Sequence, residues 1–189
     1  MISGVPAVPI DAQRVLDFWF ADGMVERWFH ATAALDDEIR GSFEPSWRRA
    51  AVGELDHWAA TADGALALVI VLDQFPLNMF RGHAAAFASE AKAIAVAREA
   101  IARGLDQHLD PARMAFLYLP LMHSEDLAHQ DESVRLFEQA GLASNARFAR
   151  HHRDLIRRFG RFPHRNGLLG RASTAEELAY LASPEAFSG

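Results

Sequence analysis

Residues 84–104 read AAAFASEAKAIAVAREAIARG, and this stretch is the clearest helix signal in the chain. Alanines and charged residues recur through it at helical spacing, and alanine has the highest helix propensity of all residues. Gly104 closes the stretch, and glycine is the residue most often found just past the carboxyl end of a helix. The pattern therefore predicts a long helix that ends at Gly104.

Two further helix starts precede this stretch. Asp11 and Thr32 are residue types that cap helices, and we expect Asp11 to cap a helix that runs through Phe20. Thr32 is expected to cap a second helix, which meets Pro45, because proline interrupts a helix interior. The amino-terminal part of the chain is therefore predicted to be helical as well.

The apolar run ALALVIVL, residues 65–72, has two interpretations. Taken alone, it is equally typical of a buried strand. Asp63, which we expect to cap it, and its helical surroundings favour a central helix that ends near Pro76. The run is far shorter than the roughly 20 residues that a membrane-spanning helix needs, so no membrane partner is expected.

Helix signals continue toward the carboxyl end. Asp110 followed by Pro111 predicts a cap and a first-turn proline. Gly141 is expected to end the next long helix, and Ser173 with Glu176 forms a capping-box pattern for a last short helix. Strand signals are otherwise nearly absent. We therefore predict an all-α protein of antiparallel helices, packed as a single domain over residues 1–189, with residues 1–10 as a loose N-terminal segment.

The composition is that of an ordinary globular protein. The 189 residues include no cysteine, which excludes disulfides, thiolate metal sites and cysteine nucleophiles. The first 13 residues, MISGVPAVPIDAQ, lack a basic start, a long apolar run and a small-residue cleavage site. They show no export signal, so we expect a cytoplasmic protein.

Arginine dominates the positive charge of this acidic chain. The formal net charge is −6, and Lys92 is the one lysine among nineteen basic residues. Residues 147–171 hold eight arginines and three histidines against one acid, Asp154. Guanidinium groups form paired hydrogen bonds with oxyanions, so this block is suited to phosphate, carboxylate or nucleic acid. The alternative is a solvated helix face neutralised by acidic neighbours.

Asp73 and Gln74 form the first candidate site. On a helical wheel they share a side with apolar residues of the central helix, so we expect both to be buried. A buried carboxylate near the carboxyl end of a helix needs a cation or several donors. We expect an arginine partner for Asp73. Buried acids are usually paired for structural reasons, so this pair is interpreted first as a clamp between helices, with a role in a binding site as the alternative.

The segment LPLMHSEDLAHQ, residues 119–130, forms the second candidate site. We expect Pro120 in the first turn of a helix, Ser124 inside its apolar arc, and His123 and Glu125 on either side of it. Such a pair suits proton transfer or substrate binding if a cleft opens there. The alternative for His123 is a hydrogen-bonded residue that packs helices together. No GxSxG pattern surrounds Ser124, so a serine nucleophile is not favoured.

Two pairs have the carboxylate-x-x-histidine spacing of di-iron helical bundles: Glu54 with His57, and Asp126 with His129. The supporting glutamates that such a site needs on two further helices are not identifiable, and the wheel places His129 near the exposed side. We therefore predict no metal site and no cofactor.

The third candidate site is the basic segment NARFARHHRDLIRRFGRFPHRNGLLGR, residues 145–171. His152 falls on the apolar stripe of the predicted helix together with Phe148, so we expect both to point inward. Gly160 is expected to end this helix. Pro163 then forces an extended path, and the loop that follows is dense in polar side chains of the kind that carry function. These loop residues are His164, Arg165 and Asn166.

Four blocks of this sequence resemble a bacterial family called domain of unknown function nine hundred and twenty-four. The blocks are VLDFWF, LVIVLDQFPLNMFRG, FLYLPLMHSEDLA and HRDLIRRFGRFPHRN. The resemblance implies a tetratricopeptide-like (TPR-like) all-α fold and no established activity. The family usually has a basic residue at the position of Leu77, so a role for charge at this position is doubtful here. It usually has an acid at the position of His129, which argues against a metal-binding role for His129. The polar positions that match the blocks are Asp73, Gln74, Asn78, Arg81, His123, Ser124, Glu125, Asp126, His152, Arg153, Arg161, His164, Arg165 and Asn166.

Two functional hypotheses follow from these positions. The first is a cleft that binds or transforms a small anionic molecule, with arginines as the anion-binding groups and His123, Glu125 and His164 as candidate catalytic residues. The second is a non-enzymatic TPR-like scaffold that binds a protein or peptide partner. Nucleic acid is not expected as a partner, because the protein is acidic and nearly lacks lysine. The sequence predicts no oligomeric state. The anion-binding arginines are Arg81, Arg153, Arg161 and Arg165, and the other ligand-binding candidates are Asp73, Gln74, Asn78, Ser124, His152 and Asn166.

Overall fold

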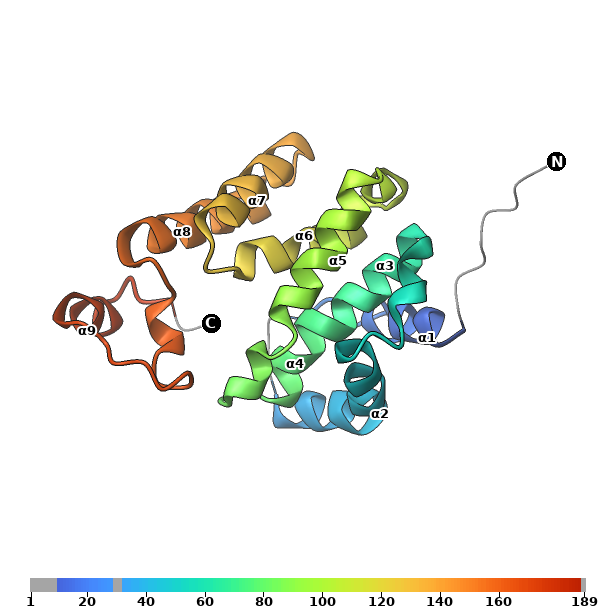
Figure 1. The fold of residues 1–189 in the computed structure, drawn as a ribbon, viewed down its shortest axis with the longest axis horizontal. Helices are drawn as coiled ribbons and strands as arrows, with labels where there is room; N and C mark the ends of the chain where they lie inside the picture. Colours follow the sequence, from blue (N-terminus) through green and yellow to red (C-terminus); the bar gives the residue numbers. More distant parts are fainter. Residues whose placement is uncertain (1–9, 29–31, 188–189) are drawn as a thin grey trace. The chain divides into compact units, whose positions relative to one another are not determined.

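The computed structural model describes residues 10–28 and 32–187. Residues 1–9, which make up nearly all of the predicted loose segment, lie outside this range. All regular secondary structure in the described ranges is helical, as predicted. These residues fold into two compact units (Figure 1). The first contains the chain up to Arg81 together with Ala85–Pro120, and the second contains Gly82–Ala84 and the chain from Leu121 onward.

The first unit is built around one continuous helical rod over residues 62–79. It consists of α3 (Ala62–Val69), a π turn (Ile70–Gln74) and α4 (Phe75–Met79). Residues 65–72 are no more than 1% exposed. The other helices of the unit are α1 (Ile10–Trp19), α2 (Ala33–Ala51), α5 (Glu90–Ala102) and most of α6 (Pro111–His123).

The rod is covered by its neighbours within the unit. Helix α3 packs against α1 and α5, and α2 packs against α4 and the π turn. A helix that is apolar all round is stable in water only when it is enclosed in this way. Ala62–Met79 is long and apolar enough by composition to cross a membrane, but 72% of it is buried within the protein, as expected of a core helix.

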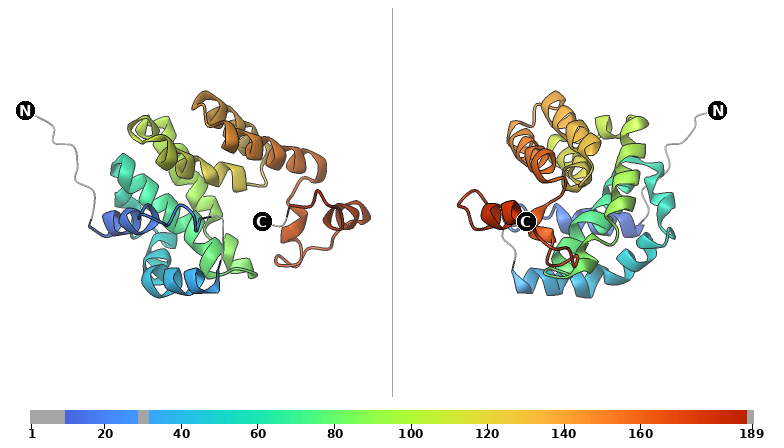
Figure 2. Two further views of the ribbon diagram at one scale, coloured as in Figure 1. Left: turned by 180° about the vertical axis from the view of Figure 1, so that it is seen from behind. Right: turned by 60° about the vertical axis from the view of Figure 1, so that its left-hand side comes forward.

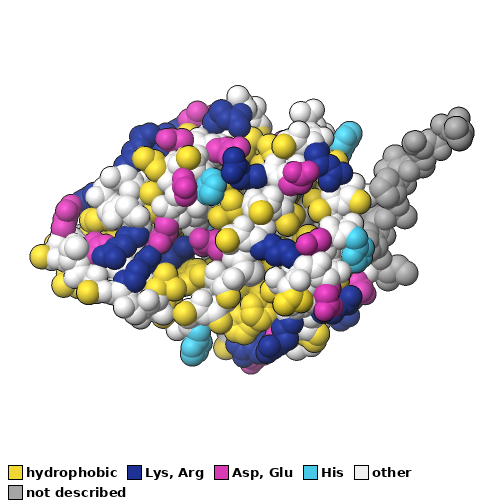
Figure 3. Space-filling model, in the orientation of Figure 1, with side chains coloured by type: hydrophobic (Ala, Val, Ile, Leu, Met, Phe, Trp, Pro, Cys, Tyr) yellow, Lys and Arg dark blue, Asp and Glu magenta, His cyan; other side chains and the backbone are white. Residues whose placement is uncertain are grey.

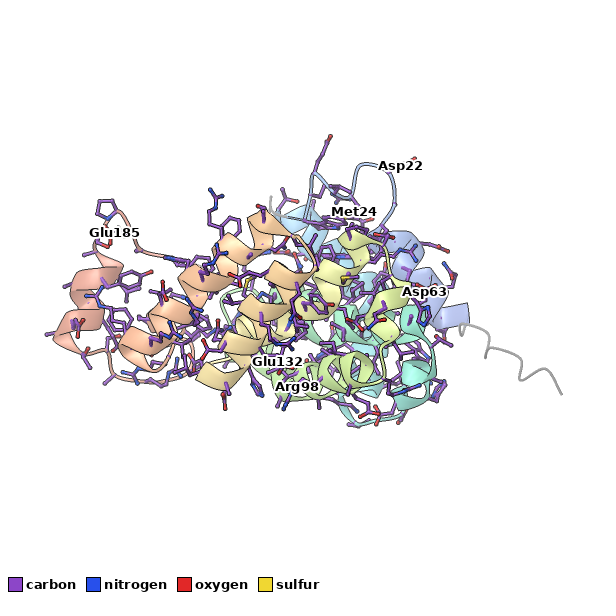
Figure 4. All side chains as sticks on the ribbon, turned by 90° about the horizontal axis from the view of Figure 1, so that it is seen from above. Asp22, Met24, Asp63, Arg98, Glu132 and Glu185 are labelled. Atoms are coloured by element: carbon purple, nitrogen blue, oxygen red, sulfur yellow. The ribbon has the colours of Figure 1, made fainter. Side chains whose placement is uncertain are left out.

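Thr61, and not Asp63, caps this central helix. The Thr61 hydroxyl accepts the N–H of Gly64 at 3.0 Å, while Asp63 lies in the first turn and forms an ion pair with Arg113 at 3.0 Å (Figure 4). Gly64 is required here for space, because a Cβ atom at this position would lie 2.0 Å from the carbonyl oxygen of Trp58. The preceding 3₁₀ turn, Asp56–Ala60, therefore lies directly against the helix start.

The absence of an N–H group at Pro76 accounts for the π turn. Without that donor, the carbonyl of Leu72, four residues earlier, loses its helical partner. The hydroxyl of Ser89 donates to this carbonyl at 2.6 Å. The N–H of Phe75 reaches the carbonyl of Ile70, five residues back, which is the π pattern. π turns inside α-helices are frequent at functional sites.

An aromatic cluster fills the interior of the first unit. Phe75 on the rod lies 4.7 Å from Phe43 of α2 and 5.6 Å from Trp19 of α1, measured between ring centroids. Trp28 and Phe116 lie 4.6 Å apart with their planes at 74°. Edge-to-face pairs of this kind add to the free energy gained from apolar burial. Trp19 also lies 5.7 Å from Phe116, so the rings of α1, α2, α4 and α6 pack together.

Two predictions about prolines were wrong. Helix α2 begins at the predicted cap, Thr32, whose hydroxyl accepts the N–H of Leu35 at 3.2 Å, but it runs through Pro45 to Ala51. Pro120 lies inside α6 and not in a first turn. In both cases the proline costs one backbone hydrogen bond, and the packing of the helix around it outweighs that local cost.

The second unit contains α7 (Leu127–Gln139), α8 (Ala143–Phe159) and α9 (Ala175–Leu181), with a 3₁₀ turn at Pro163–Arg165. Helices α7 and α8 lie side by side as an antiparallel pair (Figure 2). The predicted ends are confirmed, since Gly141 and Gly160 follow α7 and α8 in the left-handed conformation that ends helices.

The last helix begins one residue later than predicted. The capping box is formed by Thr174 and Glu177, and not by Ser173 and Glu176. Beneath it lies a small apolar cluster that joins α8, the loop after it and α9. The buried members of this cluster are Leu155, Ile156, Phe162 and Tyr180.

Candidate functional site

The predicted site residues fall into two groups, one in each unit. The first group lies on the π turn, on α4 and just after α4, and its members are Asp73, Gln74, Asn78 and Arg81. The second lies at the end of α6, in the break between α6 and α7, on α8 and on the loop after α8, and its members are His123, Ser124, Glu125, His152, Arg153, Arg161, His164, Arg165 and Asn166.

In the first group, the π turn places two polar side chains in contact. Asp73 is 4% exposed, as the helical wheel predicted, and its Oδ2 accepts a hydrogen bond from Nε2 of Gln74 at 2.6 Å. The side-chain amide of Asn78 donates to the backbone carbonyl of Gln74 at 2.9 Å. The arginine partner that we expect for Asp73 stays a prediction.

Arg81 forms an ion pair with Asp36 of α2. Its Nε and Nη2 donate to the two carboxylate oxygens of Asp36 at 2.9 and 3.1 Å, and Nη2 also donates to Asn78 at 3.2 Å. The hydrogen bonds to Asp36 and its negative charge raise the pKa of Arg81 above its usual value, against the opposing effect of burial. Arg81 was predicted to bind an anion. In the structure it connects the chain just after α4 to α2.

The second group contains a helix break where one continuous helix was expected. Helix α6 ends at His123 and α7 begins at Leu127, capped by Asp126, whose Oδ1 accepts the N–H groups of Ala128 and His129 at 2.7 and 3.4 Å. Two such bonds satisfy N–H groups that a helix start leaves open. Because of this break, His123 and Glu125 do not flank Ser124 on one helix.

Glu125 is held in place by three hydrogen bonds. Arg171 donates to both carboxylate oxygens at 2.6 and 2.9 Å, and the N–H of Phe162 donates to Oε1 at 2.8 Å. Burial acts to raise the pKa of this carboxyl group, but the bonds to Arg171 and Phe162 outweigh it and the net pKa is lowered. Glu125 is therefore ionised at neutral pH.

Arg161 and Glu177 form a second ion pair of the same type. Nε and Nη2 of Arg161 donate to the two oxygens of Glu177 at 2.6 and 2.9 Å, and Nη2 also donates to the carbonyl of Ala172. The bonds from Arg161 and from the N–H of Thr174 lower the pKa of Glu177 to about 2, against the opposing effect of desolvation. Arg161 thus joins the end of α8 to the start of α9.

The loop after α8 is packed inward. Arg165 is 5% exposed, its Nη2 donates to the carbonyl of His123 at 2.8 Å, and its guanidinium lies 4.7 Å from the ring centroid of Phe162. Asn166 is buried and bonds to Ser173 at 3.1 Å. Both loop residues thereby fix the position of the loop relative to its neighbours.

Two histidines of this group are neutral at physiological pH. His152 is buried as predicted, and Nδ1 donates to the carbonyl of Phe148 at 2.8 Å; desolvation lowers its pKa to about 3. The pKa of His164 is lowered to about 4, chiefly by burial and then by the nearby charge of Arg165. The Nδ1 atom of His164 is buried and has no hydrogen-bond partner among the described residues. Phe148, predicted to point inward, is 47% exposed.

The basic face of α8 is neutralised by acidic neighbours. Arg150 bonds to Glu138 at 2.7 Å, and Arg157 to Asp131 at 2.9 Å. Arg153, a predicted ligand-binding residue, lies 3.7 Å from Asp131 as well. Positive and negative side chains are interspersed on the face visible in Figure 3. This pattern is the neutralised helix face, which the sequence had left as an alternative.

The carboxylates of both carboxylate-x-x-histidine pairs bind other groups, and that of Glu54 accepts a hydrogen bond from Nε of Arg49 at 3.1 Å. Asp126 uses its carboxylate to cap α7, and Ser124 lies 2.9 Å from Nδ1 of His129. Across residues 10–28 and 32–187, no group of three or more potential metal ligands occurs.

Four residues that sequence reasoning missed complete these contacts. Asp36 and Arg171 are the partners of predicted site residues, and Glu177 occupies the third position of the capping box. Phe187 lies close to the histidine rings. Of these four residues, Glu177 alone had a local sequence signal, the capping pattern TAEE. Asp36 and Arg171 form long-range pairs and Phe187 is a single aromatic residue, so none of these three leaves a local pattern.

Comparison with known proteins identifies the family. Residues 15–185 match the family described as "Bacterial protein of unknown function (DUF924)". The chain belongs to the DUF924 family. It is also similar to a solved protein of unknown function, ATU0120 from Agrobacterium tumefaciens, with 43% identity and a TM-score of 0.87. That match covers 90% of this chain and 96% of the other. No curated protein matches this DUF924 chain.

The DUF924 match extends over both units and over every predicted site residue. The resemblance found in the four sequence blocks is thereby confirmed at the level of the family. The names of these relatives assign no activity.

Proposed function

We propose that this DUF924 protein binds a small anionic molecule in the second unit, beside His164. One observation carries the proposal. The Nδ1 atom of His164 is buried without a hydrogen-bond partner in the described part of the chain. A buried polar atom of this kind costs about 1–3 kcal/mol, so its presence calls for an explanation. A ligand that accepts a hydrogen bond from it provides one.

The charges around His164 support an anion as that ligand. The guanidinium groups of Arg165 and Arg171 are close enough to lower its pKa, while Glu125 acts in the opposite direction. With its pKa near 4, the imidazole is neutral at pH 7 and one ring nitrogen carries a proton. When that nitrogen is Nδ1, it donates to a carboxylate or phosphate oxygen in a positive environment.

The hydrogen bonding of Glu125, His164, Arg161 and Arg81 indicates which of these residues are structural and which one can transfer a proton. Glu125 is ionised and already bound by Arg171 and Phe162, so it fixes the position of Arg171 and is not a proton donor at neutral pH. His164 has a ring nitrogen, Nδ1, without a hydrogen-bond partner in the described part of the chain, so we assign it to accept or donate a proton if the protein transforms the ligand. Arg161 and Arg81 are assigned to structural ion pairs.

The test is a thermal-shift and calorimetric screen of the full chain with inorganic phosphate, phosphorylated metabolites, nucleotides and carboxylates. His164→Phe removes the nitrogens and keeps a ring, and His83→Phe is the control because His83 is an exposed histidine of the same unit. We expect a compact set of anions to stabilise the wild type and the control, and not His164→Phe. No stabilisation of the wild type by any anion would overturn the proposal.

A second candidate function is supported by the ion pairs themselves. Arg81–Asp36, Arg171–Glu125 and Arg161–Glu177 are each formed through two hydrogen bonds, as in a rigid helical scaffold. Under this proposal the helices stack in a TPR-like arrangement and bind a protein or peptide. A screen without anion effects, together with saturable binding of a defined peptide, favours it. Both proposals place the protein in the cytoplasm, with no membrane and no nucleic acid as a partner.

A further inference from the structure

The ring of Phe187 lies among three histidine rings of the second unit. Its centroid is 4.5 Å from that of His152, 5.2 Å from that of His164 and 6.2 Å from that of His151. All three pairs are edge-to-face, with interplanar angles of 68°, 80° and 74°. Phe162 completes the surroundings, at 5.4 Å from His152 and 5.6 Å from His164.

The segment that carries Phe187 is attached by few hydrogen bonds. It follows α9 and includes Glu185, which Figure 4 labels. In the described part of the chain, its bonds to α9 end on Tyr180: the N–H of Phe187 donates to the Tyr180 hydroxyl at 2.8 Å, and the N–H and hydroxyl of Ser183 donate to the Tyr180 carbonyl at 2.9 and 2.7 Å. The N–H of Ala186 donates within the segment, to the carbonyl of Ser183 at 3.2 Å. A short segment held by so few bonds opens at a lower free-energy cost than the helices it lies on.

We propose that Phe187 occupies a subsite for an aromatic ring, and that the anionic ligand carries a ring that replaces it. This inference rests on the proposed anion site at His164 and names its substrate class, an aromatic phosphate or carboxylate. His152, His164 and Phe162 form the ring subsite, and His164 belongs to both parts of the site.

The placement of Arg165 connects the two parts. Its guanidinium packs over the ring of Phe162 and lies near enough to His164 to lower the pKa of that imidazole. A ligand ring in the place of Phe187 therefore packs against the ring of His164, and the anionic group of the same ligand accepts a hydrogen bond from Nδ1 of His164. Neutral imidazoles suit such a ligand, because they pack against an aromatic ring without the desolvation cost of a charge.

The experiment uses three probes on the full chain: phenol, inorganic phosphate and phenyl phosphate. Phenol tests the ring subsite alone, phosphate tests the anion site alone, and phenyl phosphate tests both. The variant Phe187→Ala empties the subsite. Phe148→Ala is the matched control, because it removes a phenyl ring that is 47% exposed on α8 of the same unit. Affinities are measured by calorimetry on each variant.

We expect Phe187→Ala to bind phenol and phenyl phosphate about tenfold more tightly than the wild type, because the internal competitor is gone. Phosphate should bind both equally, and Phe148→Ala should behave as the wild type. Equal phenyl phosphate affinity in Phe187→Ala and the wild type overturns the ring subsite and leaves the anion site standing. Phenol binding without phosphate binding overturns the anion site and leaves the ring subsite standing.

A second measurement keeps the inference testable without any ligand. In NMR titrations, removal of the Phe187 ring should expose His152 and His164 to water and move their pKa values upward toward that of free histidine. Phe187→Leu, which retains an apolar side chain, should move them less and serves if Phe187→Ala fails to fold. Unchanged titration of both histidines in a folded Phe187 variant would show that the ring does not cover them.

Discussion

Arg161 binds Glu177 through two parallel hydrogen bonds, from Nε to Oε1 at 2.6 Å and from Nη2 to Oε2 at 2.9 Å. Glu177 also accepts the N–H of Thr174, so one carboxylate caps α9 and joins that helix to the end of α8. The planar fork of arginine fits a carboxylate in this way, whereas the single ammonium group of lysine does not.

Arg161→Lys therefore tests whether Arg161 is structural. We expect the melting temperature to fall by about 2–4 °C, the shift typical of losing one such interaction in a chain of this size. Affinity for phosphate should stay within about twofold of the wild type, because the charge is retained. Differential scanning fluorimetry and calorimetry measure the two quantities. A loss of phosphate binding without loss of stability would contradict the structural role.

The pair of Glu125 and Arg171 should be energetically coupled. Glu125→Ala leaves the guanidinium of Arg171 and the N–H of Phe162 without their acceptor. We expect the single variant to lose about 2 kcal/mol of unfolding free energy, as for hydrogen bonds to charged groups. A double-mutant cycle with Arg171→Ala, measured by urea unfolding, should give a coupling energy of about 1 kcal/mol or more. A coupling energy near zero would rule out the pair as a clamp.

The buried His152 predicts a loss of stability in acid. Its pKa is about 3 in the folded protein, below the ordinary value of 6.5, so the unfolded chain binds a proton that the folded chain does not. Stability is therefore fully present above pH 6.5 and falls as the pH drops from 6.5 to 3, by up to about 1.4 kcal/mol per pH unit.

Urea unfolding at several pH values measures this slope. His152→Phe keeps a ring in the same place without a titrating group, so its slope between pH 6 and 5 should be smaller by about one proton. His83→Phe, at an exposed position that is not among the charges acting on the pKa of His152, should leave the slope unchanged. An unaltered slope in His152→Phe would show that this histidine does not limit acid stability.

The explanation of the π turn predicts that Pro76→Ala restores part of the stability that Ser89→Ala removes. Ser89→Ala removes the donor to the carbonyl of Leu72, and that buried carbonyl should then cost about 1–3 kcal/mol of unfolding free energy. Pro76→Ala restores a backbone N–H four residues after Leu72. The double variant should therefore lose less stability than Ser89→Ala alone. Ser144→Ala, at an exposed position of α8, is the control. A double variant less stable than Ser89→Ala would disprove this explanation.

Much of the fold could be predicted because helix signals are local. Thr32, Asp110, Gly104, Gly141 and Gly160 all lie at helix ends, as expected from backbone chemistry within a few residues. Predictions failed where two neighbouring patterns competed. The sequence STAEE contains two overlapping capping boxes, and the contacts of Glu177 with Arg161 and Asn166 select the second.

The site was less predictable because its contacts join distant positions. Glu125 and Arg171 are 46 residues apart, and no spacing rule relates them. Helical wheels correctly placed Asp73 and His152 in the interior, since burial follows helical periodicity. The wheel failed at Glu125, because the cap formed by Asp126 ends one helix and starts the next. Whether His123, Glu125 and His164 act on a ligand stays a prediction.

The close approach at Gly64 makes that position a diagnostic of local backbone geometry in other chains. A Cβ atom there would lie only 2.0 Å from the carbonyl oxygen of Trp58, a distance that real Cβ atoms do not show. Any relative with alanine or a larger residue at the equivalent position must therefore have displaced its 3₁₀ turn away from the helix. The residue type at the position of Gly64 therefore indicates whether the connection between α2 and α3 in a relative has the same backbone conformation as in this protein.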